Sequence, residues 1–207
     1  MTNLDMKKTL KHLYKPSAKE ISIVELPAMN YLMIDGEGSP SSEGYLNALK
    51  ALYTLAYSVR AISKEAGQVF TVMPLEGLWS FEGQETSNFV VTAEDKENFV
   101  WTLMILQPEH ITAEIVAQAR ETASKKKDSP VRLADVRFER YEEGSAVQIL
   151  HMGSYDNEGE TVARLHHHIE ANGWKLGKDH HEIYLNDPRK VAPEKLKTII
   201  RQPFEKA

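Results

Sequence analysis

The sequence predicts an α+β fold of duplicated βαββ units, whose antiparallel sheets are related by a pseudo-two-fold axis with a ligand groove between them. A first observation is a repeat: Gly38-Ser39, three residues and Glu43-Gly44 recur 115 residues later as Gly153-Ser154, three residues and Glu158-Gly159. A second is that the same offset aligns apolar residues ahead of both segments, Ile21 with Val136, Ile23 with Phe138, Leu32 with Val147 and Ile34 with Ile149. One such unit cannot cover its own apolar sheet face, so two copies should pack together and leave a groove for a ligand between them.

The first repeat is expected over about residues 20–107. Residues 21–25 and 30–35 have the pattern of strands separated by Pro27, most simply a hairpin or a bulged strand. Apolar residues at helical spacing predict a helix over about 44–65 that ends near Gly67. Residues 69–81 are strand-like, and the run 100–106, apolar on both faces, indicates a central, covered strand.

A helix over 109–127, opened by Pro108, is expected to join the repeats. It ends in Lys125-Lys126-Lys127, which could bind an anionic ligand or, more simply, complement the negative end of the helix. The second repeat is expected over about 131–206. It should contain strands at 131–140, 146–152, 181–185 and 197–204, a helix from about 160 to the cap at Gly173, and a helix start at Pro193.

Composition limits the kinds of function. The chain has 207 residues, a formal charge of −5 and no cysteine. An acidic balance argues against a nucleic-acid surface, and the missing cysteines fit a reducing compartment. Residues 1–19 are expected to be a polar N-terminal leader and 20–206 a single domain, with no signal peptide or membrane span. We therefore expect a cytoplasmic monomer without nucleic-acid or membrane partners.

Histidines do not form a recognisable metal site. His166, His167 and His168 are consecutive, so on a helix they point about 100° apart and cannot close one site. His180, His181 and Glu182 are neighbours on a strand and face opposite ways. The sequence predicts no metal and no cofactor.

Glu182 is the strongest candidate for chemistry. The two-residue period of a strand places Glu182 and Tyr184 on one face and Ile183 and Leu185 on the other. If the isoleucine face packs against a helix, Glu182 faces the groove, where partial burial should raise its pKa. It could then act as a counter-ion for a lipophilic cation or as a general base toward water. The alternative is an exposed strand residue.

Trp79 and Phe81 share one face of their strand by the same period. They could line a pocket or fill the core.

Three motifs resemble the GyrI-like small-molecule-binding proteins. The run from His180 to Arg189, continued through 192–198 and 201–203, resembles their C-terminal signature. Residues 74–79 (PLEGLW) are similar to their central motif, and His151-x-Gly153-x-Tyr155 followed by Glu158-Gly159 is similar to their second-repeat turn. The resemblance covers about residues 20–206. Asn186 stands where a small serine is common in the signature, at a loop position not expected to alter the pocket.

This resemblance implies a hydrophobic groove at the pseudo-dyad with a glutamate among aromatic residues, which accepts planar, cationic or polycyclic compounds. The residues expected to contact the ligand are Trp79, Phe81, His151, Tyr155, Glu182 and Tyr184. Some members of the family are effector sensors fused to helix-turn-helix domains, and some sequester toxins. Others resemble hydrolases that open the cyclopropane of DNA-alkylating natural products.

Three functions remain open. The first is capture of lipophilic aromatic or cationic compounds, with Glu182 as the charge partner. The second is hydrolysis, in which Glu182 deprotonates a water and Tyr155 or Tyr184 hydrogen-bonds the carbonyl that becomes a phenolate. The third is a module that binds a protein partner such as a topoisomerase. No fused DNA-binding domain is expected in this chain, which removes the output of a transcription regulator.

Overall fold

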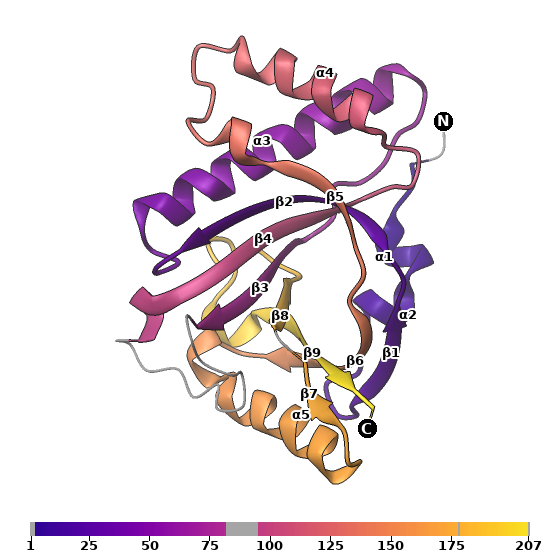
Figure 1. The fold of residues 1–207 in the computed structure, drawn as a ribbon, viewed down its shortest axis with the longest axis vertical. Helices are drawn as coiled ribbons and strands as arrows, with labels where there is room; N and C mark the ends of the chain where they lie inside the picture. The colour runs from indigo at the N-terminus through magenta and orange to yellow at the C-terminus, as the bar shows by residue number, and fades with distance from the viewer. Residues whose placement is uncertain (1–2, 82–94, 178, 207) are drawn as a thin grey trace.

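The computed structural model describes residues 3–81, 95–177 and 179–206, and within them the chain forms an α+β fold around one large antiparallel sheet (Figure 1). The sheet has the order β1-β6-β9-β8-β3-β4-β2-β5, and β7 pairs with β9. Its strands are β1 Ser22–Leu26, β2 Met29–Glu37, β3 Leu75–Phe81, β4 Phe99–Gln107, β5 Arg137–Tyr141, β6 Gly144–Met152, β7 Lys175–Leu176, β8 His180–Tyr184 and β9 Lys197–Glu205. The α-helices are α1 Met6–Thr9, α2 Lys11–Tyr14, α3 Glu43–Glu65, α4 Ala113–Ser124 and α5 Gly159–Ala171.

The hairpin expected on either side of Pro27 is wrong. β1 pairs with β6, 118 residues and more along the chain, while β2 pairs with β4 and β5. The physical reason is that each strand edge needs a partner. β6 has β9 on one side only, and β1 pairs with its other edge; in the same way, β5 pairs with the edge of β2 that β4 leaves open. β5 and β6 begin 115 residues after β1 and β2.

Helix α3 agrees with the prediction, whereas the joining helix is shorter than expected. Ser42 caps α3 by accepting a hydrogen bond from the Tyr45 N–H. The segment after Pro108 forms a turn, and α4 begins only at Ala113, behind the N-cap Thr112. α4 ends at Ser124, so the three lysines follow its C-terminus.

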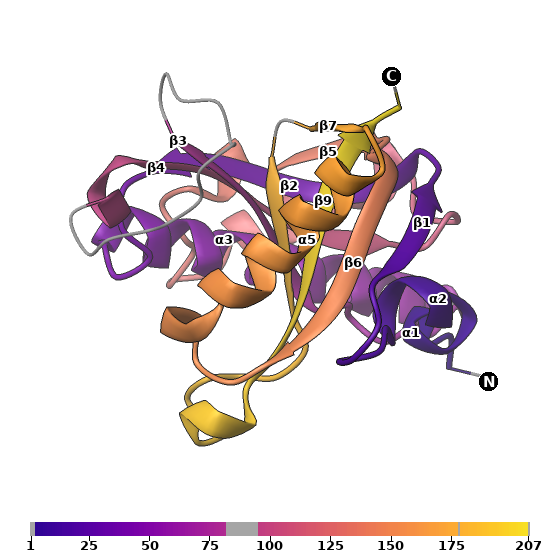
Figure 2. The ribbon, with the colours of Figure 1, turned by 90° about the horizontal axis from the view of Figure 1, so that it is seen from below.

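Paired residues in adjacent strands point to the same face, which places the helices relative to the candidate site. Glu182 is paired with Gly77 on β3 and with Ile200 on β9. Ile200 packs in a core cluster with α5, which lies along β6 and β9 (Figure 2). α3 packs on β2 and β4 at the other end of the molecule. The face of Glu182 is therefore flanked by the two long helices.

The N-terminal residues pack against the opposite face of the sheet. Leu13 and Tyr14 are buried in the main core. The carbonyl oxygen of Leu13 accepts a hydrogen bond from Arg201 on β9, and that of His12 accepts one from Gln148 on β6. This segment, expected as a leader, thus covers the same face as Ile183, and the sequence did not predict its contacts.

The described helices include none long and apolar enough to cross a membrane.

Candidate functional site

Glu182 lies in the middle strands of the sheet, where β8 is held between β3 and β9. Its side chain keeps 13% of its surface exposed. The Tyr184 hydroxyl donates a hydrogen bond to one carboxylate oxygen at 2.7 Å, and the His180 Nε2 lies 3.2 Å from the other. Both partners come from the same strand and the same face, as the two-residue period predicts. The alternative, that Glu182 is an exposed residue of its strand, is wrong.

The pKa of Glu182 moves in the direction opposite to the prediction. Burial raises this pKa, but the hydrogen bonds from His180, Tyr184 and Glu158 stabilise the charged form and outweigh burial, so that the pKa is lowered. Glu182 is therefore an ionised carboxylate in a largely buried setting. It can serve as a counter-ion, and it can accept a proton from water.

Glu158 is a member of the site that sequence analysis did not identify. It forms the N-cap of α5, is 6% exposed, and interacts electrostatically with Glu182. Burial and the charge of Glu182 raise the pKa of Glu158 to about 10. Burial was expected to raise the pKa of Glu182, but the pKa that is raised is that of Glu158. Its place in the Glu-Gly repeat was visible in the sequence, but the equivalent Glu43 is exposed.

Trp79 connects the carboxylate to an aromatic cluster. Its indole N–H donates a hydrogen bond to the Tyr184 hydroxyl at 3.0 Å. Its ring stacks on Tyr45 from α3, with 6.1 Å between centroids. Gly77 makes room for this arrangement, because a Cβ there would lie 2.7 Å from the Trp79 Nε1. Trp79 is only 4% exposed, so it fills the core beside Glu182.

Phe81 continues this cluster toward the end of β3. It is half-buried and stacks on Phe99 of β4, with 5.1 Å between the ring centroids. Phe99 in turn meets Trp79 edge-on at the same separation. The three rings form one continuous aromatic cluster.

Tyr155 is the most exposed predicted site residue, at 39%. Its ring meets that of Tyr184 edge-on, with 5.8 Å between centroids. Burial and the charges of Glu158 and Glu182 raise the pKa of Tyr155 to about 12, so its phenol stays neutral. Tyr155 is therefore a partly exposed ring beside Tyr184.

His151 is buried and stabilises the turn that leads into α5. Its Nδ1 lies 2.9 Å from the Thr161 hydroxyl, and its Nε2 lies 3.2 Å from the Ser154 carbonyl oxygen. Both ring nitrogens are thus engaged within the chain. By fixing this turn, His151 helps to place Tyr155 and Glu158.

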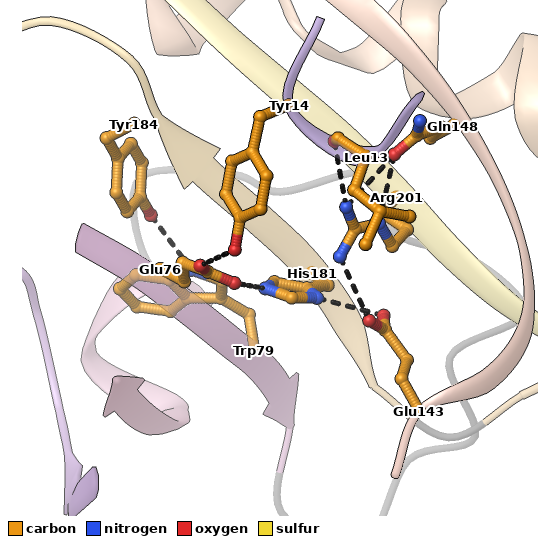
Figure 3. A network of polar contacts seen from close by, with 9 residues as sticks. All are labelled: Leu13, Tyr14, Glu76, Trp79, Glu143, Gln148, His181, Tyr184 and Arg201. Atoms are coloured by element: carbon orange, nitrogen blue, oxygen red, sulfur yellow. Dashed lines mark hydrogen bonds and ion pairs between the residues drawn. The ribbon is translucent and has the colours of Figure 1, made fainter. Parts of the chain in front are cut away.

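A buried polar network lies on the opposite face of the sheet, behind Glu182. Figure 3 shows the His181 imidazole between the carboxyl groups of Glu76 and Glu143, with contacts of 3.1 and 2.9 Å. Tyr14 donates a hydrogen bond to Glu76 at 2.6 Å, and Arg201 donates one to Glu143 at 3.1 Å. The network joins the N-terminal segment to β3, β8 and β9.

The charged forms of His181, Glu143 and Arg201 stabilise one another in this network. Burial lowers the pKa of His181, but the Glu143 carboxylate outweighs burial and raises it to about 9. Burial raises the pKa of Glu143, but the charges of His181 and Arg201 outweigh it and lower the pKa to about 2. A fully buried network with these partners holds β8 in register, and we assign it a structural role.

The histidine clusters do not form a metal site in the described part of the chain, where no group of three or more His, Cys, Asp or Glu side chains could hold a metal ion. Two open hollows of about 460 and 570 Å³ lie away from Glu182. The first is beside Asp35 and Trp101, and the second lies between α3 and α4. Neither has a buried charge, so the Glu182 region remains the better candidate.

Comparison with solved structures supports the same fold over the whole chain. An uncharacterized conserved protein from Listeria innocua is 37% identical over 98% of this chain and 100% of its own, with a TM-score of 0.89. A hydrolase encoded by lin2189 of Listeria innocua is 36% identical over 99% and 100%, with a TM-score of 0.86. Another hydrolase from Listeria innocua is 35% identical over 98% and 100%, with a TM-score of 0.85. No match was found among curated proteins.

The family comparison agrees with the motifs at the site. The profile of the GyrI-like small molecule binding domain matches residues 19–204. This range includes β3, α5 and β8, which carry Trp79, Glu158 and Glu182. The chain therefore belongs to the family of GyrI-like small molecule binding domains.

Proposed function

We propose that this protein binds lipophilic aromatic or cationic small molecules beside Glu182, for cellular protection or sensing. The observation that carries the proposal is an ionised, 13% exposed carboxylate whose neighbours are aromatic rings. A cation gains from an opposite charge that is poorly hydrated, and a flat apolar ligand gains from stacking on aromatic side chains. Membership of a small-molecule-binding family supports this function.

The contact residues in this proposal are those on the Glu182 face. Tyr184 and Tyr155 border the carboxylate, and the cluster of Trp79 and Phe81 forms the apolar side. His151 acts by holding the turn beneath Tyr155. A direct binding measurement with an aromatic cation, in wild type and Glu182→Gln, tests the assignment.

We place the groove on a pseudo-two-fold axis between β3 and β8. Exchanging β1 with β5, β2 with β6, β3 with β8 and β4 with β9 leaves the strand order unchanged when it is read from the other end. This order and the 115-residue offset of the first two strands support two related halves, about 20–107 and 131–206. An experimental structure in which residues 31–62 and 146–172 do not superpose as strand and helix would contradict the duplication.

Hydrolysis is the second candidate, and one observation favours it: two structures that cover nearly the whole chain at 35–36% identity are described as hydrolases. In the proposed reaction Glu182 takes a proton from water while the water oxygen bonds to a cyclopropane carbon. The carbon–carbon bond of the ring breaks, and its electron pair moves to a conjugated carbonyl, which becomes a phenolate. Tyr155 or Tyr184 donates a hydrogen bond to that oxygen, and the phenolate takes up a proton, so the net change is addition of one water.

Mass spectrometry separates the two candidates. A cyclopropane-bearing indole drug is incubated with the protein and then analysed. A mass gain of one water, lost in Glu182→Gln, supports the hydrolase. Drug that is bound but recovered unchanged supports a binding protein.

We further propose that the protein is a monomer and that it acts in the cytoplasm. The absence of cysteine supports the second point, because it fits a reducing compartment. Light scattering at micromolar concentration tests the monomer. A topoisomerase partner would be revealed by co-purification from cells.

A further inference from the structure

Both ring nitrogens of His181 contact carboxylate oxygens in the buried network of Figure 3. The Nδ1 lies 2.9 Å from Glu143 and the Nε2 lies 3.1 Å from Glu76, and all three side chains are at most 2% exposed. A neutral imidazole has a single N–H, so it can donate to only one of two ionised carboxylates. These two contacts therefore need one proton more than a neutral histidine and two carboxylates supply.

The second oxygen of each carboxylate shows where this proton is held. Glu76 accepts a hydrogen bond of 2.6 Å from the Tyr14 hydroxyl, and Glu143 accepts one of 3.1 Å from Arg201. Donors at these oxygens favour ionised carboxylates, so the additional proton belongs to His181. Two negative and two positive side chains then sum to zero charge, which a fully buried cluster needs in order to avoid an unpaired charge.

The other titratable groups that act on this network cannot replace the proton. Three phenols have raised pKa values and stay neutral, and they belong to Tyr14 of α2, Tyr31 of β2 and Tyr141 of β5. Asp179, just before β8, acts on Tyr141 and adds negative charge. Arg201 is already a cation. Loss of the His181 proton therefore leaves one uncompensated negative charge in the core.

The N-terminal segment, residues 3–15, covers this network. Its Leu13 carbonyl oxygen accepts a hydrogen bond of 3.1 Å from Arg201, and its Tyr14 hydroxyl donates to Glu76. In Figure 3 both residues reach the network from outside the sheet strands that carry the other charged groups. α1 and α2 have four residues each, so they depend on these contacts rather than on helical stability of their own.

The segment is also the part of this cover that can move at least cost. β3, β8 and β9, which carry Glu76, His181 and Arg201, each pair with a strand on both sides. Admitting water between them would break two ladders of hydrogen bonds, whereas lifting the segment breaks a few separate contacts. A buried charge that has lost its partner is stabilised by water. Water is therefore expected to enter from the side of the N-terminal segment.

We propose that residues 3–15 form a pH-sensitive latch, which closes over the sheet while His181 is protonated and detaches, admitting water to Glu76, when that proton is lost. The latch is independent of the proposed function, because it lies on the face opposite Glu182 and needs no ligand.

The sign of the pH dependence follows from the histidine. The pKa of His181 is raised to about 9 from 6.5. The stabilisation of the closed latch is then fully present below about pH 6.5 and is lost as the pH rises through about 9.

Methionine methyl groups report the state of the latch in the full-length protein. Met6 lies in the segment and is 7% exposed, Met33 and Met104 lie in the sheet and are at most 3% exposed, and Met152 is 47% exposed. In NMR spectra of protein labelled with methyl-13C methionine, the Met6 signal should move toward the position of an exposed methionine, with a midpoint near pH 9. The signals of Met33 and Met104 should keep their positions up to pH 10.

Glu76→Gln is the decisive variant, because it supplies the missing proton in a form that cannot titrate. The amide oxygen accepts from Tyr14, and the amide N–H donates to the Nε2 of a neutral His181, whose Nδ1–H donates to Glu143. The buried charges still sum to zero. We therefore expect the Met6 signal of Glu76→Gln to keep its buried position up to pH 10.

His167→Gln is the matched control, since it removes an exposed histidine outside the network and should keep the wild-type midpoint. Glu158, whose pKa is raised to about 10, titrates in an overlapping range. It is present in both wild type and Glu76→Gln, so it cannot account for a difference between them.

Three outcomes would overturn the latch. They are a Met6 signal of wild type that does not move up to pH 10, a joint movement of Met6, Met33 and Met104 that shows general unfolding, and a wild-type midpoint in Glu76→Gln. If Glu76→Gln does not fold, 15N NMR of the histidine rings in wild type decides. Both ring nitrogens of His181 should be protonated at pH 7 and lose one proton over the range in which Met6 moves, and a neutral His181 at pH 7 overturns the proposal.

Discussion

Tyr184 donates a hydrogen bond of 2.7 Å to Glu182, two residues earlier on the same face of β8. The same hydroxyl accepts a hydrogen bond of 3.0 Å from the Trp79 indole on the neighbouring strand. Carboxylate, phenol and indole thus form one chain of contacts. A ligand that perturbs Glu182 is expected to alter the emission of Trp79.

Tryptophan fluorescence should therefore report ligand binding from this face of the sheet. An aromatic cation should quench wild type. Trp79→Phe should lose most of the quenching and weaken binding by about 0.5–1.5 kcal/mol, because the donor to Tyr184 is removed. Phenylalanine is preferred to alanine here, since truncating a buried tryptophan costs about 3–5 kcal/mol of stability.

Trp174 provides the matched control for this experiment. It stacks on Phe204 in the cluster beneath α5, with 4.2 Å between ring centroids. Trp174→Phe should keep the quenching. Quenching that is lost in Trp174→Phe and kept in Trp79→Phe would place the ligand elsewhere.

Tyr14→Phe should lower the free energy of unfolding by about 1–3 kcal/mol, because the buried Glu76 loses a hydrogen-bond donor. Urea denaturation measures the change. Tyr57→Phe is the matched control, since Tyr57 is 58% exposed and its loss should change little. Equal stability of the two variants would mean that the N-terminal segment does not depend on the Tyr14–Glu76 contact.

The His181 network predicts a loss of stability in mild alkali. The pKa of His181 is raised to about 9 from 6.5, so its contribution is fully present below about pH 6.5 and is lost as the pH rises through about 9. The test uses the variant Glu158→Gln, because it removes the titration of Glu158 from the same pH range. Urea denaturation of this variant should show a fall in the free energy of unfolding of about 1–3 kcal/mol over this range. A flat profile would mean that His181 is neutral in the fold.

Glu158→Gln should itself be more stable than wild type near pH 8. The pKa of Glu158 is raised to about 10 from 4.5, so wild type loses stability as the pH rises from about 4.5 through about 10. Glutamine has no proton to lose, and we expect a gain of about 1–3 kcal/mol, since one pKa unit is worth about 1.4 kcal/mol. Thermal denaturation at pH 5 and pH 8 checks this, and a gain that is not larger at pH 8 would mean that the pKa of Glu158 is not raised in the folded protein.

Sequence patterns predicted those parts of the molecule that depend on local periodicity. The α+β class, the helix 43–65 and the shared face of Glu182 and Tyr184 follow from residue spacing. The partner of β1 did not, because alternation along a strand does not determine which distant strand completes its edge.

The site was only partly predictable for a similar reason. Glu43 and Glu158 occupy equivalent positions of the repeat, yet Glu43 is exposed, whereas Glu158 is buried and is acted on by the charge of Glu182 from β8. The pKa of Glu182 was predicted with the wrong sign because its hydrogen bonds to His180 and Tyr184 depend on side-chain geometry. Tyr14 reaches Glu76 across 62 residues of chain, a contact that no local pattern contains.

The charge of Glu182 is tested most directly by comparing N-methylquinolinium and quinoline binding to wild type and Glu182→Gln at pH 7. Glutamine keeps the shape of the side chain and removes the charge. Affinity for the cation should fall about ten- to a hundredfold, the scale of about 1.5–3 kcal/mol for a charged hydrogen bond, while affinity for quinoline changes little. Equal cation affinity in wild type and in folded Glu182→Gln would exclude Glu182 from the binding site.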